Sequence, residues 1–123
     1  MKKALLLLLL LPLACGLQAQ DDARQQRYAE ECQRLYGTYL QHPGDVLNLM
    51  ALTDFYRDAD NPMRDLGQAI KYVRQAEERY RLIVGDRSHY REMKTLLRHH
   101  LTIDSIRSVK REVEQAAIYF VQH

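Results

Sequence analysis

Cysteine is scarce in this 123-residue sequence, and the motifs of most enzyme classes are missing from it. The two cysteines are Cys15, in an apolar N-terminal segment, and Cys32. If that segment is removed, Cys32 cannot form an internal disulfide, so we expect a buried thiol, with pairing to another subunit as the alternative. No nucleophile motif, phosphate-binding loop or cofactor fingerprint occurs. We therefore expect no enzymatic activity, no cofactor, and a fold that depends on packing.

Neither sign of charge is in clear excess. The sequence has 18 lysines and arginines against 16 acidic residues. Lys2 and Lys3 belong to the N-terminal segment, and without them the basic and acidic residues are equal in number. A protein that binds nucleic acid or an acidic membrane surface needs a basic surface. We therefore expect no nucleic-acid partner and no charge-driven contact with a membrane.

Residues 1–19 have the pattern of a secretory signal peptide. Two lysines precede Ala4, seven leucines, Pro12 and Leu13, and small residues follow. The apolar run of ~14 residues is shorter than the ~20 that a membrane-spanning helix needs. We expect cleavage after Ala19, which leaves 20–123 as the exported protein. The leader resembles bacterial ones of the kind common in Bacteroidetes, which implies the periplasm, the cell envelope or secretion as the destination.

Lipoprotein processing is a second interpretation of the leader. Leu13-Ala14-Cys15-Gly16 resembles a bacterial lipobox, although Pro12 stands where that motif has an aliphatic residue. Cys15 would then carry a lipid. Under this alternative the protein is an envelope lipoprotein with a mainly structural role, and it contacts the membrane only through the lipid.

Apolar residues recur three and four positions apart along most of the remaining chain, which predicts an all-α fold. A leading helix is expected over 23–42, where His42 and the proline after it end the pattern. The final helices are expected over 86–122. Their apolar stripe changes phase near Thr102, so we expect a break there.

The central stretch, 43–84, predicts two helices joined by a turn. Asp45 is placed to cap a helix that begins near Val46, because its carboxylate can accept hydrogen bonds from the first free amides. The Ala-Asp-Asn-Pro sequence at 59–62 ends this helix. Asp65 is placed in the same way to cap the second helix.

The spacing in this stretch resembles a tetratricopeptide-type repeat, nearest to the Sel-like variant. The matching positions are Pro43, Leu49, Leu52 and Tyr56, followed by Asp65, Ala69, Tyr72 and Ala76 in the pattern Asp-x-x-x-Ala-x-x-Tyr-x-x-x-Ala. Thr53, Ala59 and Asn61 depart from the usual small residue and loop glycines. The resemblance implies antiparallel helix pairs, stacked as a short tetratricopeptide-like array of about five helices after the signal peptide, with 86–122 as a degenerate second pair.

The resemblance also implies a protein-protein interaction module or scaffold. In this class the first helix of each pair lines a concave face that binds a protein or a peptide. The positions implied as partner-binding are Leu47, Met50, Asp54 and Arg57 in the first pair and Arg91, Thr95 and Arg98 in the second. We expect a groove with an apolar and acidic end beside a basic end. The apolar segment 116–121 suggests either that this chain is the front part of a longer array or that its last helix contacts a partner or a second copy of the chain.

A metal site is the remaining alternative. His100 and Asp104 are four residues apart and would share a face if one helix ran through both. The break expected near Thr102 separates them, and adjacent residues such as His99 and His100 point about 100° apart on a helix. We therefore expect solvated histidines, and keep a metal-binding or enzymatic protein that uses His99, His100 and Asp104 as the alternative.

Overall fold

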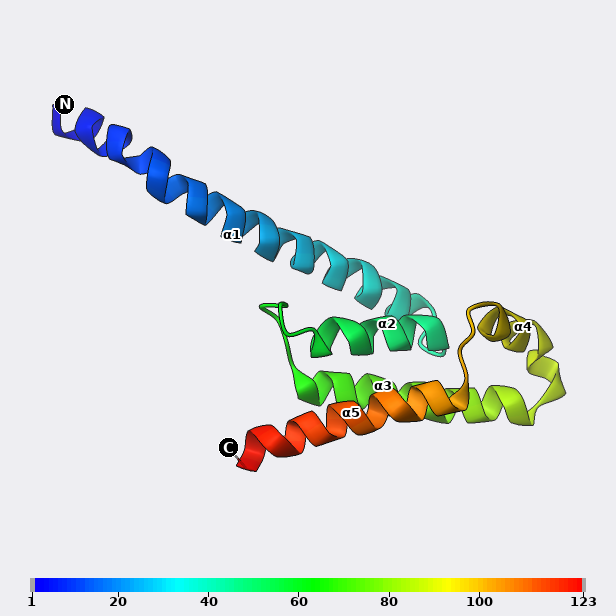
Figure 1. The fold of residues 1–123 in the computed structure, drawn as a ribbon. Helices are drawn as coiled ribbons and strands as arrows, with labels where there is room; N and C mark the ends of the chain where they lie inside the picture. Colours follow the sequence, from blue (N-terminus) through cyan, green and yellow to red (C-terminus); the bar gives the residue numbers. More distant parts are fainter. Residues whose placement is uncertain (1, 123) are drawn as a thin grey trace.

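The computed structural model describes the backbone of residues 2–122 and the side chains of residues 21–121. This part of the chain forms five α-helices and one short 3-10 helix (Figure 1). In chain order they are α1 (Lys2–Gln41), α2 (Val46–Arg57), α3 (Leu66–Gly85), η1 (Arg87–His89), α4 (Tyr90–Arg98) and α5 (Ile103–Gln122). No strand occurs within residues 2–122, and the predicted all-α class is confirmed.

Helix α1 is longer than the leading helix expected over 23–42. It ends at Gln41 and extends back to Lys2. The signal peptide and the lipidation candidate Cys15 fall among residues whose side chains lie outside the described part, so both stay predictions. Residues 21–27 are exposed, and partly buried positions begin at Tyr28.

The first residues of α2 and α3 are fixed by capping aspartates. Asp45 Oδ1 accepts hydrogen bonds from the backbone N–H groups of Leu47 (3.1 Å) and Asn48 (3.5 Å). Asp65 Oδ1 accepts one from the N–H of Gln68 (3.1 Å). These bonds satisfy amides that have no partner within the first turn of a helix. Both predicted caps are confirmed.

Asn61 closes the loop between α2 and α3. Its buried side chain donates from Nδ2 to the carbonyl oxygen of Phe55 (2.7 Å) and accepts at Oδ1 from the N–H of Met63 (2.8 Å). An asparagine side chain can supply such turn-closing bonds in place of backbone groups. The loop therefore forms without a glycine at this position.

Helices α2 and α3 are antiparallel neighbours at the centre of the molecule (Figure 1). Leu49 and Leu52 of α2, and Ala69 and Ala76 of α3, are each at most 1% exposed. Alanine ends at Cβ, so it allows the backbone of a neighbouring helix to come close while larger side chains fill the space beside it. Both small residues of α3 are thus buried, and Ala76 belongs to the same core cluster as Leu49 and Leu52 of α2.

Tyrosine rings attach α1 to this central pair. The ring of Tyr72 on α3 stacks on Tyr56 of α2, with centroids 5.9 Å apart, and meets the edge of Tyr39 of α1 at 5.3 Å. The hydroxyl of Tyr39 donates to Gln75 Oε1 (3.1 Å). Aromatic pairs of this kind bury large apolar areas while their hydroxyls keep polar partners. The second half of α1 is therefore part of the core.

Cys32 of α1 is half-buried and is the free cysteine of the described residues. Its Sγ lies 3.7 Å from the Tyr56 hydroxyl, a distance at which sulfur and oxygen can share a hydrogen bond. Burial, together with this contact, raises the pKa of Tyr56 above its usual value. The phenol therefore stays neutral, which suits its place between α1 and α3.

Helix α5 packs along α3 and runs antiparallel to it (Figure 1). Ile106 and Val113 of α5 are buried, and Lys110 Nζ donates to Glu77 Oε2 (2.9 Å). This hydrogen bond lowers the pKa of the Glu77 carboxyl. The arrangement differs from the second helix pair expected over 86–122. Helix α4 is only nine residues long, and α5 packs mainly along α3.

The break between α4 and α5 has a clear local cause. His100 has a φ of 54°, the left-handed conformation that ends helices. Thr102 Oγ1 accepts from the N–H of Ser105 (3.1 Å), and Ser105 Oγ accepts from the N–H of Thr102 (3.1 Å). This reciprocal pair caps α5 in the manner of a capping box. The predicted break near Thr102 is confirmed.

Substitution of Ala76 by leucine tests the close approach of α2 and α3. The added side chain has no space, so we expect the free energy of unfolding to fall by about 1–3 kcal/mol. The matched control is Ala29→Leu, at an exposed helical position of α1, with an expected effect below about 0.5 kcal/mol. Urea unfolding followed by circular dichroism measures both, and equal effects would contradict the packing described above.

Candidate functional site

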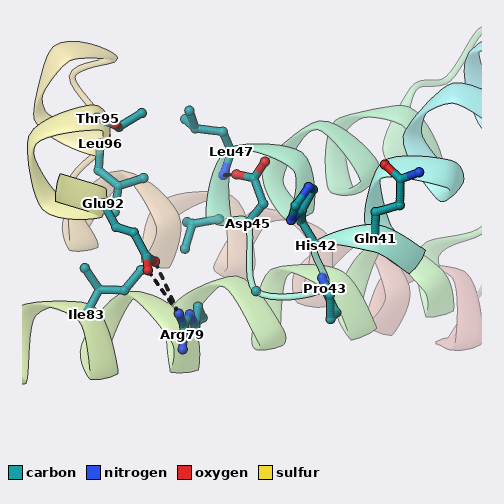
Figure 2. A pocket seen from close by; sticks show the side chains of 12 residues that line it. Gln41, His42, Pro43, Asp45, Leu47, Arg79, Ile83, Glu92, Thr95 and Leu96 are labelled. Atoms are coloured by element: carbon teal, nitrogen blue, oxygen red, sulfur yellow. Dashed lines mark hydrogen bonds and ion pairs between the residues drawn. The ribbon is translucent and has the colours of Figure 1, made fainter. Parts of the chain in front are cut away.

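A pocket of about 420 Å³ lies where the α1–α2 turn, α3 and α4 meet. In Figure 2 the side chains of α4 stand on one side, those of the turn and of α2 stand on the other, and Arg79 and Ile83 of α3 lie below them. Its size is within the usual range for ligand pockets. The lining residues are Gln41, His42, Pro43, Gly44, Asp45, Val46, Leu47, Arg79, Ile83, Glu92, Thr95 and Leu96.

The α1–α2 turn, which forms one wall, is fixed by its backbone. The N–H of His42 donates to the carbonyl oxygen of Thr38 (2.7 Å), and the N–H of Asp45 donates to the carbonyl oxygen of His42 (3.1 Å). A Cβ on Gly44 would lie 2.9 Å from Arg79 Nε, closer than real Cβ atoms approach other atoms. The turn therefore lies directly against the guanidinium of Arg79, and a side chain at position 44 would require that guanidinium to shift.

Arg79 joins three elements at the pocket. Its Nη2 lies 3.2 Å from Glu92 Oε2 of α4, while its Nε is buried beside the turn with no hydrogen-bond partner among the described residues. Glu92 Oε1 is also 3.2 Å from His89 Nδ1, so the carboxylate is shared by two basic side chains. Arg79 is therefore the residue at which the turn, α3 and α4 meet.

The remaining wall is mainly apolar. Leu47, Ile83 and Leu96 come from α2, α3 and α4 respectively, and polar groups of Gln41 and Thr95 lie at the same pocket. The carboxylate of the capping aspartate is already occupied by the first amides of α2. Such a pocket can hold an aliphatic side chain and offer a few hydrogen bonds to the backbone around it.

The structure brings together two of the seven residues implied as partner-binding. Leu47 and Thr95 both line the pocket, although they are far apart in the sequence. Met50 is only 9% exposed and belongs to the core, so it is not on an open groove. The exposed arginines Arg91 and Arg98 of α4 do not line the pocket.

Asp54 and Arg57 lie farther along α2, and Arg57 contacts α5. Arg57 Nε is 3.0 Å from Asp54 Oδ1, and its Nη1 is 2.8 Å from Glu112 Oε2. Arg57 therefore joins α2 to α5 through Glu112, away from the pocket, and Asp54 pairs with Arg57 on the same helix. Arg79 is not among the predicted site residues. It follows two glutamates in a stretch with the composition of a solvated helix face, so the sequence does not indicate its contact with the turn.

The three residues of the metal alternative do not converge. His99 caps the end of α4, His100 is in the left-handed turn, and Asp104 is in the first turn of α5. All three are exposed. Within the part of the chain with described side chains, no group of three metal-ligating residues is close enough to hold an ion.

The chain has no match among protein-family models, curated proteins or solved structures. In the described part of the chain, no helix combines the length and the apolar character needed to cross a bilayer.

The Gly44–Arg79 contact gives a prediction with an internal control. Gly44→Ala should lower the free energy of unfolding by about 1 kcal/mol, because the new methyl group meets the guanidinium. In an Arg79→Ala background the same substitution should be neutral, or stabilising by about 0.4–1 kcal/mol, since alanine reduces the entropy of the unfolded chain. A double-mutant cycle in urea measures this. Equal effects in the two backgrounds would contradict the contact.

Proposed function

We propose that this chain is an exported helical-repeat module that binds another protein in the bacterial envelope and acts as a scaffold, without catalytic activity. The observation that carries the proposal is the pocket at the junction of three elements, with one apolar wall and few polar groups. Short peptide segments are often recognised in this way, by an apolar anchor side chain and hydrogen bonds to the chain around it.

The helix order supports the repeat part of the proposal. Helices α1, α2, α3 and α5 each pack on the next and alternate in direction (Figure 1). Layers of this kind are the basis of helical-repeat arrays, in which each element contacts mainly its neighbours. The tetratricopeptide-like spacing of Ala69, Tyr72 and Ala76 coincides with positions that are buried.

The pocket suggests how a partner segment would bind. An aliphatic side chain would enter between Leu47 and Leu96, which line the pocket from α2 and α4. Gln41 and Thr95 would then be available for hydrogen bonds to the backbone of the segment. Because Arg79 is held by Glu92 and the turn, the walls are fixed before the partner arrives, which lowers the entropy cost of binding.

Export fits the contacts of α1. The side chain of Arg24 donates to the carbonyl oxygen of Asp60, and the contacts of Tyr28 and Tyr39 follow farther along the helix. All of these lie after Ala19, so cleavage there would leave them intact.

Capture by the immobilised full chain tests the binding site. We expect a specific protein from envelope extracts to be retained by the wild type and lost about tenfold or more with Thr95→Arg, because the arginine fills the pocket. Arg91→Glu and Arg98→Glu are controls on the same helix and should retain the partner. Thermal unfolding confirms that each variant is folded.

The outcomes separate two surfaces. If Arg91→Glu and Arg98→Glu abolish capture and Thr95→Arg does not, the binding site is on the exposed face of α4 and not at the pocket. Capture that is unaffected by all three substitutions would contradict a binding role for this region.

Mass spectrometry of the protein purified from a bacterial host, with its own leader, tests export. We expect a chain that begins at Gln20, or at its cyclised form, because a signal peptidase cuts after Ala19. A lipid-modified chain that begins at Cys15 would instead establish the lipoprotein alternative. An uncleaved chain that begins at Met1 would contradict both.

A further inference from the structure

The last turns of α5 expose an apolar surface at the end of the molecule distant from the junction pocket. Ile118, Phe120 and Val121 are 56%, 63% and 88% exposed. Ile106 and Val113, earlier on α5, are buried, whereas these three residues near its end are exposed. Large exposed apolar patches on a small protein commonly mark an interaction site.

Two clefts lie beside this part of α5. The first, of about 370 Å³, is lined by Ile70, Arg74, Glu114, Ala117, Ile118 and Val121. The second, of about 290 Å³, is lined by Arg64, Leu66, Ala117 and Phe120. At 100° per residue, Phe120 and Ile118 lie on opposite sides of Ala117 around the helix. One cleft therefore lies on each side of the contact between the end of α5 and the start of α3.

The charge beside these clefts is unbalanced. The guanidinium carbon of Arg64 lies 5.4 Å from the centroid of the Phe120 ring, and Arg64 has no ion pair with any described residue. The neighbouring Arg74 is paired with Glu114 (3.3 Å), and Asp65 is occupied as the cap of α3. The surface thus combines apolar clefts with one arginine that lacks a carboxylate partner.

We propose that this surface docks an amphipathic helix of a partner protein, with apolar side chains in both clefts and an aspartate or glutamate on Arg64. A second copy of the chain is disfavoured because, in a symmetric contact through this surface, each copy presents Arg64 while Asp65 and Glu114 are already engaged. A bilayer is disfavoured because one unpaired arginine gives only a weak attraction to an acidic membrane surface. The surface is separate from the junction pocket and goes beyond the function proposed above.

Fluorescence provides a direct test because the chain contains no tryptophan. In a Phe120→Trp variant of the full chain, tryptophan emission reports burial of the α5 surface. Two synthetic helical peptides without tryptophan serve as probes, with leucine at positions i, i+3, i+4 and i+7 and either glutamate or lysine beside that stripe. We expect a saturable blue shift with the glutamate peptide and about tenfold weaker binding of the lysine peptide.

Arg64→Glu, made in the same variant, should reverse this preference. The matched control Arg87→Glu changes an exposed arginine of η1, just beyond the opposite end of α3, and should leave the preference unchanged. Amide chemical shifts of the unsubstituted protein give a second readout, with expected changes at Leu66 and Ala117. Circular dichroism checks that the variants are folded.

Several results would overturn the proposal. Equal binding of the two peptides, no saturable binding of either, or no effect of Arg64→Glu would remove the acidic helix as the occupant. A blue shift that grows with protein concentration alone would identify a second copy. A shift that occurs only with phosphatidylglycerol vesicles would identify a membrane. Each of these results is independent of the junction pocket, which Thr95→Arg tests.

Discussion

The structure depends on the close packing of α2 against α3. Ala69 and Ala76 have no exposed surface, and they leave room for the larger side chains of α2. Once this pair is formed, α3 offers further surfaces to the ring of Tyr39 from α1 and to Ile106 and Val113 from α5. A small domain has little core to spare, so a loss of complementarity at the centre would loosen every other layer.

Helix α3 also connects the two surfaces that we assign to binding. Arg79, in its second half, is placed between the α1–α2 turn and Glu92 and forms part of the junction pocket. Leu66 and Ile70, in its first half, lie beside the exposed end of α5. One central helix therefore contributes to a pocket at one end and to an open apolar surface at the other. This arrangement suits a scaffold that joins two partners.

Features that depend on neighbouring residues could be predicted from the sequence. The caps at Asp45 and Asp65 and the break near Thr102 follow from the hydrogen bonds of single side chains, and the structure has all three. Tertiary placement was harder. Periodicity does not reveal that α5 packs mainly on α3. It also does not distinguish the buried Met50 from Leu47, which lines the pocket. The role of Arg79 depends on its approach to Gly44, which no local pattern records.

The most direct test of the central packing is nuclear Overhauser spectroscopy of the tyrosine rings. The structure places Tyr56 of α2 and Tyr72 of α3 with centroids 5.9 Å apart, and Tyr39 of α1 at 5.3 Å from Tyr72. We expect cross-peaks between the ring protons of both pairs in the folded protein. Absence of the Tyr56–Tyr72 cross-peaks, with the helices otherwise intact, would show that α2 and α3 do not pack together and would contradict the account.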